Sequence, residues 1–215
     1  MSEFKLYSFF RSGTSHRLRI ALNLKGLTSE YIPINLRTEQ HLGEEYRKIN
    51  PQGFVPSLVT GGTVLTQSPA IIEWLEESYP NPPLLPASMK DRATVRAMAA
   101  LVGCDTHPIN NRRILEYLRK QFGASEDQVN AWCTHWIEEA FDALEVLVKE
   151  SNSKGTFCFG DTPTLADVYL VPQVESAKRF KVDLKRWPLI QAIDENCSQI
   201  AAFANAAPMK QMDAS

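Results

Sequence analysis

The first 80 residues alternate between short strand-like runs and stretches with helical spacing. Residues 4–10 form a run rich in residues that favour strands. Residues 15–25 then carry apolar side chains at helical spacing, among them Leu18 and Ala21, and Gly26 follows as a helix terminator. The pattern predicts a strand followed directly by a helix.

A second set of alternations completes this region. Residues 31–36 predict a strand, and residues 39–50 predict a polar helical or irregular stretch. Residues 55–59 and 63–66 predict a hairpin, because two consecutive glycines between them favour a tight turn. A helix follows at residues 69–78. The order βαβαββα predicts a small α/β domain, since a parallel strand pair needs a crossover helix and a tight turn makes its strands antiparallel.

A proline-rich segment ends this domain. Four of the eight residues 79–86 are proline, which interrupts both helices and sheets. We therefore expect an α/β domain over residues 1–80, a linker over residues 81–89 and a second domain over residues 90–215.

Beyond the linker, apolar residues recur at three- and four-residue spacing with almost no strand-like alternation. Thr164 and Asp167 have the spacing of a capping box, which satisfies free N–H groups at the start of a helix. The second domain should be all helical, with helical stretches at residues 90–122, 125–151, 164–180 and 188–206.

The composition narrows the classes of function. Apolar residues make up 44% and charged residues 22% of the chain, as in a soluble globular protein. The net charge of −2 gives no general attraction to nucleic acid or to anionic lipid. No window approaches the roughly 20 apolar residues of a membrane span, and residues 1–10 do not resemble a targeting leader. We expect a cytoplasmic protein without a nucleic-acid or membrane partner.

The potential metal-binding residues are scattered. No pair has CxxC spacing, so we expect no zinc or redox centre and mostly buried, reduced thiols. The histidines do not share a helix face at the spacing of metal ligands. We expect no metal. The residues concerned are Cys104, Cys133, Cys158, Cys197, His16, His41, His107 and His135.

Hydroxyl groups gather where the first predicted helix begins. Ser12, Gly13, Thr14 and Ser15 follow the first strand. A helix N-terminus favours negative charge, and it lowers the pKa of a thiolate held there from about 8.5. The protein places no cysteine at this point, so a thiolate would have to arrive with a ligand. Simple N-capping by these side chains is the alternative interpretation.

Two further clusters have the composition of ligand contacts. If the peptide bond before Pro56 is cis, the N–H and C=O groups of Val55 can bind the backbone of an extended ligand. Gln67 and Ser68 precede the proline that begins another predicted helix, where N–H groups and a hydroxyl can hold a carboxylate. Capping is again the alternative.

These three clusters, in this order on a βαβαββα background, resemble the glutathione transferase superfamily, and the resemblance covers essentially the whole chain. It implies a thioredoxin-like N-terminal domain followed by a helical-bundle domain, with glutathione as cofactor. It also implies that Gln67 and Ser68 bind the γ-glutamyl end of glutathione and that Val55 and Pro56 pair with its cysteinyl backbone. Gln52 resembles a further contact.

Residues 10–22 resemble the signature of the zeta class, usually written Ser-Ser-Cys-Ser-x-Arg before a similar helix. Residues 170–174 and 179–184 are similar to the C-terminal half of that class. This chain carries Gly and Thr where many members have Ser and Cys. A protein cysteine therefore has no role here, and Ser12, Thr14 or backbone N–H groups would stabilise the thiolate.

A polar patch, residues 104–113, interrupts the first helical stretch of the second domain. Pro108 should kink the helix there. Arg112 and Arg113 follow about one turn later, and arginine suits carboxylates because it offers paired donors. A solvated helix face is the alternative, but the resemblance places this stretch opposite the glutathione thiol. The adjacent arginines resemble the maleylpyruvate isomerase branch of the family.

The resemblance implies a glutathione-dependent cis–trans isomerase that converts maleylpyruvate to fumarylpyruvate in gentisate catabolism. Glutathione would add reversibly to the alkene and be regenerated. We expect Ser12, Thr14 and Arg11 to be catalytic. The expected carboxylate contacts are Arg11, Arg113 and Arg179, and the expected supporting or glutathione contacts are His107, Asn111 and Arg112.

Other functions remain open from the sequence. The first alternative is a maleylacetoacetate isomerase of tyrosine and homogentisate catabolism, because maleylacetoacetate contains the same maleyl unit as maleylpyruvate. A glutathione S-transferase or dehalogenase for small α-halo acids would use the same thiolate but consume glutathione. A non-catalytic interaction protein with the same fold is a further alternative. The resemblance also implies a homodimer.

Overall fold

The structure is a computed structural model that describes residues 3–151 and 156–215. It divides into two compact units. The first unit comprises Met1–Pro83 together with Gln199–Ser215, and the second comprises Leu84–Ser198. The C-terminal segment thus clusters with the α/β unit, whereas the sequence pattern assigns it to the helical domain. Its apolar and polar contacts, described below, are with the first unit.

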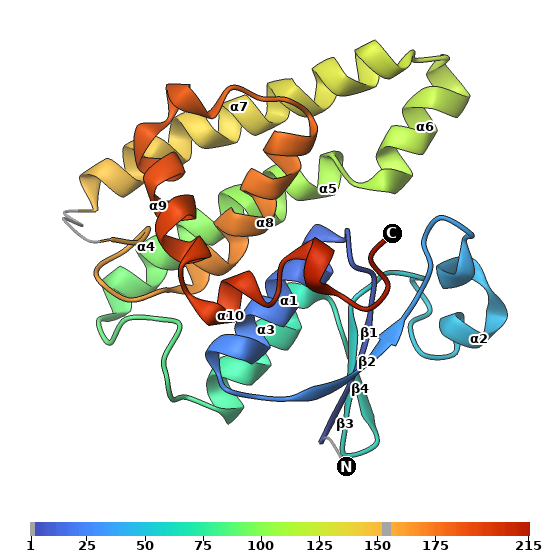
Figure 1. The fold of residues 1–215 in the computed structure, drawn as a ribbon, viewed down its shortest axis with the longest axis horizontal. Coiled ribbons are helices and arrows are strands. Elements are labelled where there is room, and N and C mark those ends of the chain that lie inside the picture. Colours follow the sequence, from blue (N-terminus) through green and yellow to red (C-terminus); the bar gives the residue numbers. More distant parts are fainter. Residues whose placement is uncertain (1–2, 152–155) are drawn as a thin grey trace. The chain divides into compact units, whose positions relative to one another are not determined.

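The first unit has the expected element order (Figure 1). Its strands are β1 (Phe4–Ser8), β2 (Ser29–Pro33), β3 (Ser57–Thr60) and β4 (Thr63–Thr66). Its helices are α1 (Gly13–Leu24), α2 (Glu44–Arg47), α3 (Ser68–Ser78) and α10 (Ala201–Ala204), with 3-10 turns at Gln40–Leu42 and Pro208–Lys210. The main difference from the predicted bounds is that the first and third strands are shorter, because the residues beside them form the loops of the candidate site.

The sheet has the strand order β2-β1-β3-β4. β1 is parallel to β2 and antiparallel to β3, and β3 is antiparallel to β4. The register pairs Tyr7 with Ser57 and Ser57 with Thr66. The end of β1, the beginning of β3 and the end of β4 therefore lie at the same end of the sheet, which is called the sheet edge below. All three polar clusters of this unit adjoin that edge.

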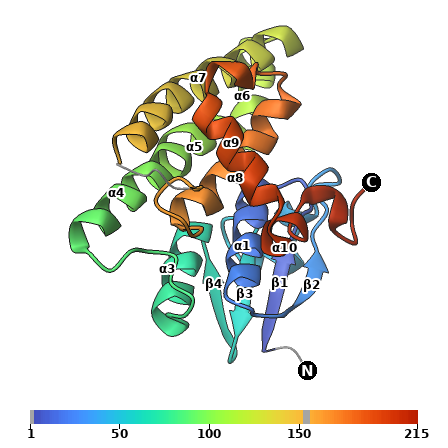
Figure 2. The ribbon, with the colours of Figure 1, turned by 60° about the vertical axis from the view of Figure 1, so that its left-hand side comes forward.

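Helices cover both faces of the sheet. α1 and α3 pack side by side on one face, and α2 lies on the other side (Figures 1 and 2). An apolar cluster of this unit contains Phe9, Phe10, Ile34, Tyr46 and Val55. Because this cluster joins the loop after β1 to the loop before β3, it fixes both loops beside the sheet edge.

A buried ion pair connects the two helices of the first face. Lys25 Nζ lies 2.5 Å from a carboxylate oxygen of Glu76, and it also donates to the carbonyl of Pro82 at 2.7 Å. Both side chains are at least nine-tenths removed from solvent. Removing one partner would leave a buried charge, which is far more destabilising than losing an exposed pair.

The second unit is all helical, as the sequence pattern predicts (Figure 2). Its α-helices are α4 (Met89–Ala100), α5 (His107–Ile109), α6 (Arg112–Phe122), α7 (Glu126–Glu150), α8 (Leu165–Arg179) and α9 (Pro188–Ser198). A π-helical turn, Leu101–Thr106, joins α4 to α5, and a 3-10 turn, Leu184–Arg186, precedes α9.

The predicted continuous helical stretch at residues 90–122 is divided in two places. The Thr106 hydroxyl donates to the Leu101 carbonyl at 2.9 Å within the wider π-helical turn. Pro108 follows this turn, where the missing N–H and the bulk of the ring disfavour a regular α-helix. The chain then breaks at Asn110 and starts α6 afresh, so the effect is larger than the expected kink.

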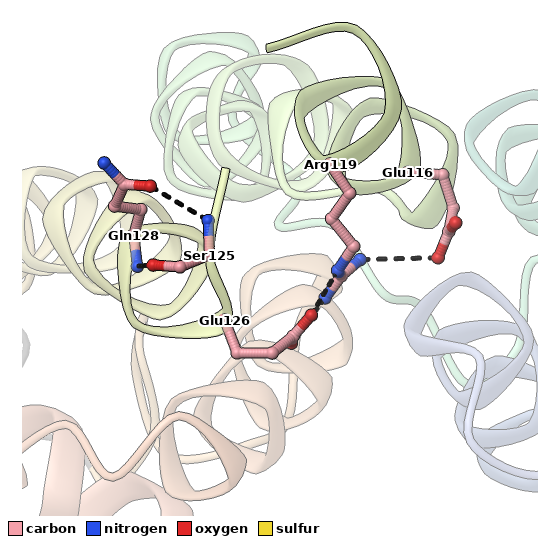
Figure 3. A network of polar contacts seen from close by, with 5 residues as sticks. All are labelled: Glu116, Arg119, Ser125, Glu126 and Gln128. Carbon is pink, nitrogen blue, oxygen red and sulfur yellow. Dashed lines mark hydrogen bonds and ion pairs between the residues drawn. The ribbon is translucent and has the colours of Figure 1, made fainter. Parts of the chain in front are cut away.

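Polar contacts define the connection between α6 and α7 (Figure 3). Arg119 donates through two nitrogens to both carboxylate oxygens of Glu126, at 2.6 and 2.9 Å, and lies 3.3 Å from Glu116. Ser125 and Gln128 form a reciprocal capping box at the start of α7. These contacts hold the end of α6 against the start of the next helix.

The capping expected at the start of α8 is present. The buried Asp167 carboxylate accepts from the Thr164 N–H at 2.7 Å and from the Cys158 N–H at 2.8 Å. Burial raises the pKa of Asp167, and these two N–H donors oppose that rise. The carboxylate therefore fastens the incoming loop to the first turn of the helix.

Among the described residues, no helix combines the length and the apolar character needed to cross a bilayer. The described ranges also contain no group of three or more His, Cys, Asp or Glu side chains that could hold a metal. Cys133, Cys158 and Cys197 are buried free thiols, as expected for most of the cysteines, and Cys104 is exposed.

Candidate functional site

The loop after β1 leads directly into α1. Ser12 has extended backbone angles, and its hydroxyl accepts the Ser15 N–H at 3.2 Å, so it is the N-cap of the helix. Arg11 precedes it and is exposed. The capping interpretation of Ser12 is therefore right, and it also places the hydroxyl at the positive end of the helix dipole.

The two candidate catalytic hydroxyls have different roles in this geometry. Ser12 Oγ and Thr14 Oγ1 are 2.8 Å apart, and Thr14 donates to the Val55 carbonyl at 2.8 Å. Since a hydroxyl carries one proton, Ser12 must be the donor between them. If the Ser12 proton turns toward a ligand, it exchanges its hydrogen bond with Thr14 for one with that ligand. Thr14 instead connects the start of α1 to the Val55 loop.

The Val55 loop is held in one shape. The peptide bond between Val55 and Pro56 is cis. The carbonyl of Phe54 accepts from the Tyr46 hydroxyl at 2.6 Å and from the Asn50 side chain at 2.7 Å. No feature of the sequence singles out Tyr46 or Asn50, because their shared partner is identified only by the fold.

Gly53 is required by the same loop. Its φ of +68° lies in the left-handed region, and a Cβ there would come within 2.9 Å of the His41 carbonyl. A larger residue would therefore be both strained and crowded.

The third cluster lies where α3 begins. Gln67 has a φ of +66°, which is unusual for a residue other than glycine, and its side-chain amide donates to Gln52 Oε1. Ser68 is 2% exposed, and its hydroxyl has no hydrogen-bond partner among the described residues. A buried, unsatisfied hydroxyl beside the free N–H groups of a helix start fits an anionic group such as a carboxylate.

The charge of this edge does not come from histidine. His16 is 3% exposed, and burial, together with the positive charges of Arg19 and Arg17, lowers the pKa of its imidazole to about 3. The imidazole is neutral at physiological pH. The N–H groups and hydroxyls at the start of α1 favour an anion there without any contribution from this imidazole.

The remaining candidate residues belong to the second unit. Asn111 is the N-cap of α6, and its side chain accepts from the backbone N–H of Arg113 at 3.1 Å. Arg112 and Arg113 are exposed in the first turn of that helix, and His107 begins α5. Asn111 thus has a structural role that fixes the backbone of the arginine pair.

Arg179 lies in the last turn of α8. It donates to the Ser176 hydroxyl at 3.0 Å, and its guanidinium carbon is 5.2 Å from the centre of the Phe180 ring. Phe180 packs against the cluster that contains Cys133. Burial raises the pKa of the Cys133 thiol to about 11, and the positive charges of Arg179 and Arg119 oppose that rise.

The start of α6 approaches the same turn of α7. The Asn110 side chain donates to the Cys133 carbonyl at 3.3 Å, and the Trp132 indole donates to the Ile109 carbonyl at 3.2 Å. The segment just before α6 therefore contacts the α7 turn that contains Trp132 and Cys133. The other candidates, Arg11, Ser12, Thr14, Gln52, Val55, Pro56, Gln67 and Ser68, all belong to the first unit.

Comparisons with known proteins match both units. Residues 11–78 fit the profile of the glutathione S-transferase N-terminal domain, and residues 126–202 fit that of the C-terminal domain. The chain is 62% identical to a maleylpyruvate isomerase of a Ralstonia species over 209 residues, 97% of this chain and 99% of the relative. The chain belongs to the glutathione S-transferase family.

Solved structures of the family agree with this assignment. One is a holo maleylpyruvate isomerase described as a bacterial zeta-class glutathione S-transferase. It is 62% identical with a TM-score of 0.97, covering 98% of this chain and 100% of the other. A second is a maleylacetoacetate isomerase from Anaeromyxobacter dehalogenans with glutathione in its active site. It is 38% identical with a TM-score of 0.87, and all of both chains is covered. This glutathione S-transferase is a zeta-class member.

Proposed function

We propose that this zeta-class protein is a glutathione-dependent cis–trans isomerase that converts maleylpyruvate to fumarylpyruvate in gentisate catabolism. The observation that carries the proposal is the 62% identity to the Ralstonia maleylpyruvate isomerase over nearly the full length of both chains. The geometry of the α/β unit supports it, because the hydroxyls and helix starts expected to hold glutathione adjoin one sheet edge.

The main support for glutathione binding is the start of α3, where polar groups can hold a carboxylate. The unsatisfied hydroxyl of Ser68 and the adjacent N–H groups suit the γ-glutamyl carboxylate. Gln67 and Gln52, which contact each other, border this position. Val55 and Pro56 offer backbone groups for the cysteinyl part of an extended tripeptide, and Thr14 fixes that loop.

In the proposed reaction, bound glutathione supplies a thiolate that adds reversibly to the maleyl double bond and so permits rotation about it. The Ser12 hydroxyl donates a hydrogen bond to the thiolate sulfur, with its proton remaining on the serine oxygen, and so lowers the free energy of the charged form. The N–H groups at the start of α1 act in the same direction. Thr14 contributes by positioning, since its own proton is used at Val55.

Arginines are proposed to hold the substrate, which carries two carboxylates. Arg113 lies in the first turn of α6 and Arg179 in the last turn of α8, and both side chains are exposed. Arg11 precedes the catalytic serine and is proposed as the third carboxylate contact. Arg112 and His107 are proposed as supporting contacts. Asn111 is proposed to act by fixing the backbone of Arg113.

Maleylacetoacetate is the second candidate substrate, and the similarity to the Anaeromyxobacter maleylacetoacetate isomerase favours it. A cytoplasmic location and a homodimeric state are part of the proposal, as expected for the family.

A paired assay tests the function. Purified protein is given maleylpyruvate or maleylacetoacetate with a catalytic amount of glutathione, and the fumaryl product is followed by NMR. We expect faster turnover of maleylpyruvate and no net loss of glutathione. Stoichiometric consumption of glutathione would instead indicate a transferase or dehalogenase. Failure to bind glutathione in calorimetry would favour a non-catalytic protein and refute the proposal.

A further inference from the structure

The loop that carries the proposed catalytic serine has few internal contacts. Residues 9–12 lie between the end of β1 and the start of α1. Within this loop, the Ser12 N–H donates to the Phe9 carbonyl at 3.1 Å. One such hydrogen bond contributes only about 1 kcal/mol. Ser12 itself is held on its helix side by the Ser15 N–H, the Thr14 hydroxyl and the His16 N–H. The residues before Ser12 depend on contacts from outside the loop.

Those contacts converge on Phe10, two residues before Ser12. The buried guanidinium of Arg19 donates to the Phe10 carbonyl at 3.0 Å and to the Phe9 carbonyl at 3.5 Å. On the other side, the Phe10 N–H donates to a carboxylate oxygen of Asp213 at 3.0 Å. Both polar backbone groups of Phe10 are thus held, one by α1 and one by the C-terminal segment.

The C-terminal segment is itself anchored to the same unit. The second carboxylate oxygen of Asp213 accepts from the Tyr31 hydroxyl at 2.7 Å. Arg37 donates to the Ser215 hydroxyl at 2.9 Å and to its carbonyl at 3.0 Å. Ala214 packs against the apolar cluster that contains Phe10. The residues after α10 are therefore fixed to the first unit at Asp213, Ala214 and Ser215; Figure 1 shows the course of this C-terminal segment.

Asp213 and Arg19 also interact through their opposite charges. Arg19 is 4% exposed and also donates to the Ala206 carbonyl at 2.9 Å, which ties α1 to the C-terminal segment. Burial lowers the pKa of Arg19 to about 10, and the negative charge of Asp213 opposes that change. The carboxylate thus stabilises the buried cation that holds the other side of Phe10.

We propose that the C-terminal segment is a strap for the catalytic loop and that Asp213 is a positioning residue, which acts on the bound thiol through Phe10 and Ser12. The inference rests on the proposed use of glutathione at the start of α1. Asp213 lies 203 positions after Phe10 in the chain, so only the fold brings this carboxylate to the loop that carries Ser12.

Two substitutions test the role of Asp213. Asp213→Ala removes the acceptor for Phe10, whereas Asp213→Asn keeps an oxygen acceptor and lets the Tyr31 hydroxyl accept from the new amide. Met212→Ala is the matched control, because the Met212 side chain is exposed in the same segment. The readouts are the ultraviolet titration of the glutathione thiol in the complex, the Kd of glutathione, kcat, and amide exchange of residues 9–12.

We expect Asp213→Ala to raise the pKa of the bound thiol by about one unit and to lower kcat about tenfold, because a displaced donor stabilises the anion less. The Kd of glutathione should change less than kcat, since the α3 contacts remain. Amide exchange at Phe10 should accelerate. Asp213→Asn should restore most of the wild-type titration, and Met212→Ala should match wild type.

A wild-type thiol titration and kcat in Asp213→Ala would overturn the proposal, as would equal effects in Asp213→Ala and Met212→Ala. If the alanine variant does not fold, Asp213→Glu replaces it. That variant keeps the charge but moves the acceptor by one methylene, and an unchanged titration would refute positioning. The titration requires glutathione but no maleyl substrate. Failure of the isomerase proposal and failure of the strap are therefore separate results.

Discussion

The two groups of candidate residues are built in different ways. At the sheet edge of the first unit, Ser12, Thr14 and Val55 form a chain of short hydrogen bonds, and Ser68 is buried. In the helical unit, Arg113 and Arg179 are exposed side chains at helix ends. A site fixed by buried polar contacts suits a ligand that never changes, such as a cofactor. Exposed arginines on helix ends can change between family members without disturbing a core, and they suit substrate selection.

The comparison predicts the largest effect for the hydroxyl of Ser12. Ser12→Gly should lower kcat about 100-fold or more, because a donor aimed at developing charge is lost. Glycine is chosen because it costs only a few tenths of a kcal/mol as an N-cap. The thiol pKa of bound glutathione should rise in parallel, measured by ultraviolet titration.

Thr14→Val is the matched control for Ser12. Since the Thr14 proton is used at the Val55 carbonyl, this variant should weaken glutathione binding more than it raises the thiol pKa. A larger rise in the thiol pKa for Thr14→Val than for Ser12→Gly would reverse the two roles.

The second prediction concerns the helical unit. Arg113→Ala should lower kcat/KM for maleylpyruvate by about 10- to 100-fold, the range for losing one charged hydrogen bond. Glutathione affinity, measured by calorimetry, should remain nearly unchanged because its proposed contacts are mainly at the sheet edge. Lys120→Ala, an exposed position on the same helix, provides the control. An equal loss of glutathione binding would mean that Arg113 belongs to the cofactor site.

The third prediction concerns how the free energy of unfolding depends on pH, because the buried His16 lies on α1 in the first unit. The folded-state pKa of His16, about 3, lies below its unfolded value of 6.5, so the unfolded chain takes up the proton first as the pH falls. The stability that the neutral imidazole contributes is full above pH 6.5 and is lost progressively toward pH 3. Between pH 7 and 5 the free energy of unfolding should fall by about 2 kcal/mol from this group.

Urea unfolding at both pH values measures this effect. His16→Gln should flatten the dependence, whereas substitution of the exposed His135 by Gln should leave the wild-type slope. Equal slopes for wild type and His16→Gln would show that the His16 imidazole does not govern the acid sensitivity.

Sequence patterns were sufficient wherever structure depends on neighbours along the chain. The element order βαβαββα, the hairpin glycines and the capping pair Thr164 and Asp167 all depend on short separations, and the structure agrees with them. The three clusters proposed to bind glutathione stood out in the sequence because they lie at the ends of predicted elements. The hydrogen bond from the Thr14 hydroxyl to the Val55 carbonyl could not be predicted, since the two residues are 41 positions apart.

Longer-range features left no trace in the sequence. Asp213 is an ordinary acidic residue near a chain end, and only the fold brings it to Phe10. The π-helical turn was also missed. Pro108 signals a disturbed helix, but the ring of Tyr169, which lies where a Cβ on Gly103 would be, belongs to another helix. Packing between distant segments decides such details, and local patterns do not encode it.

The smallest predicted effect tests whether the buried Tyr46 hydroxyl helps to fix the shape of the Val55 loop. Tyr46→Phe removes the hydroxyl that donates to the Phe54 carbonyl and lies 2.9 Å from the Ser57 hydroxyl. The Asn50 side chain still donates to that carbonyl, so the loss should be only about 1 kcal/mol of unfolding free energy, measured by urea denaturation. Tyr117→Phe, at an exposed tyrosine on α6, should have almost no effect. Glutathione affinity should fall modestly in Tyr46→Phe alone, and equal affinities in the two variants would mean that the loop keeps its shape without the buried hydroxyl.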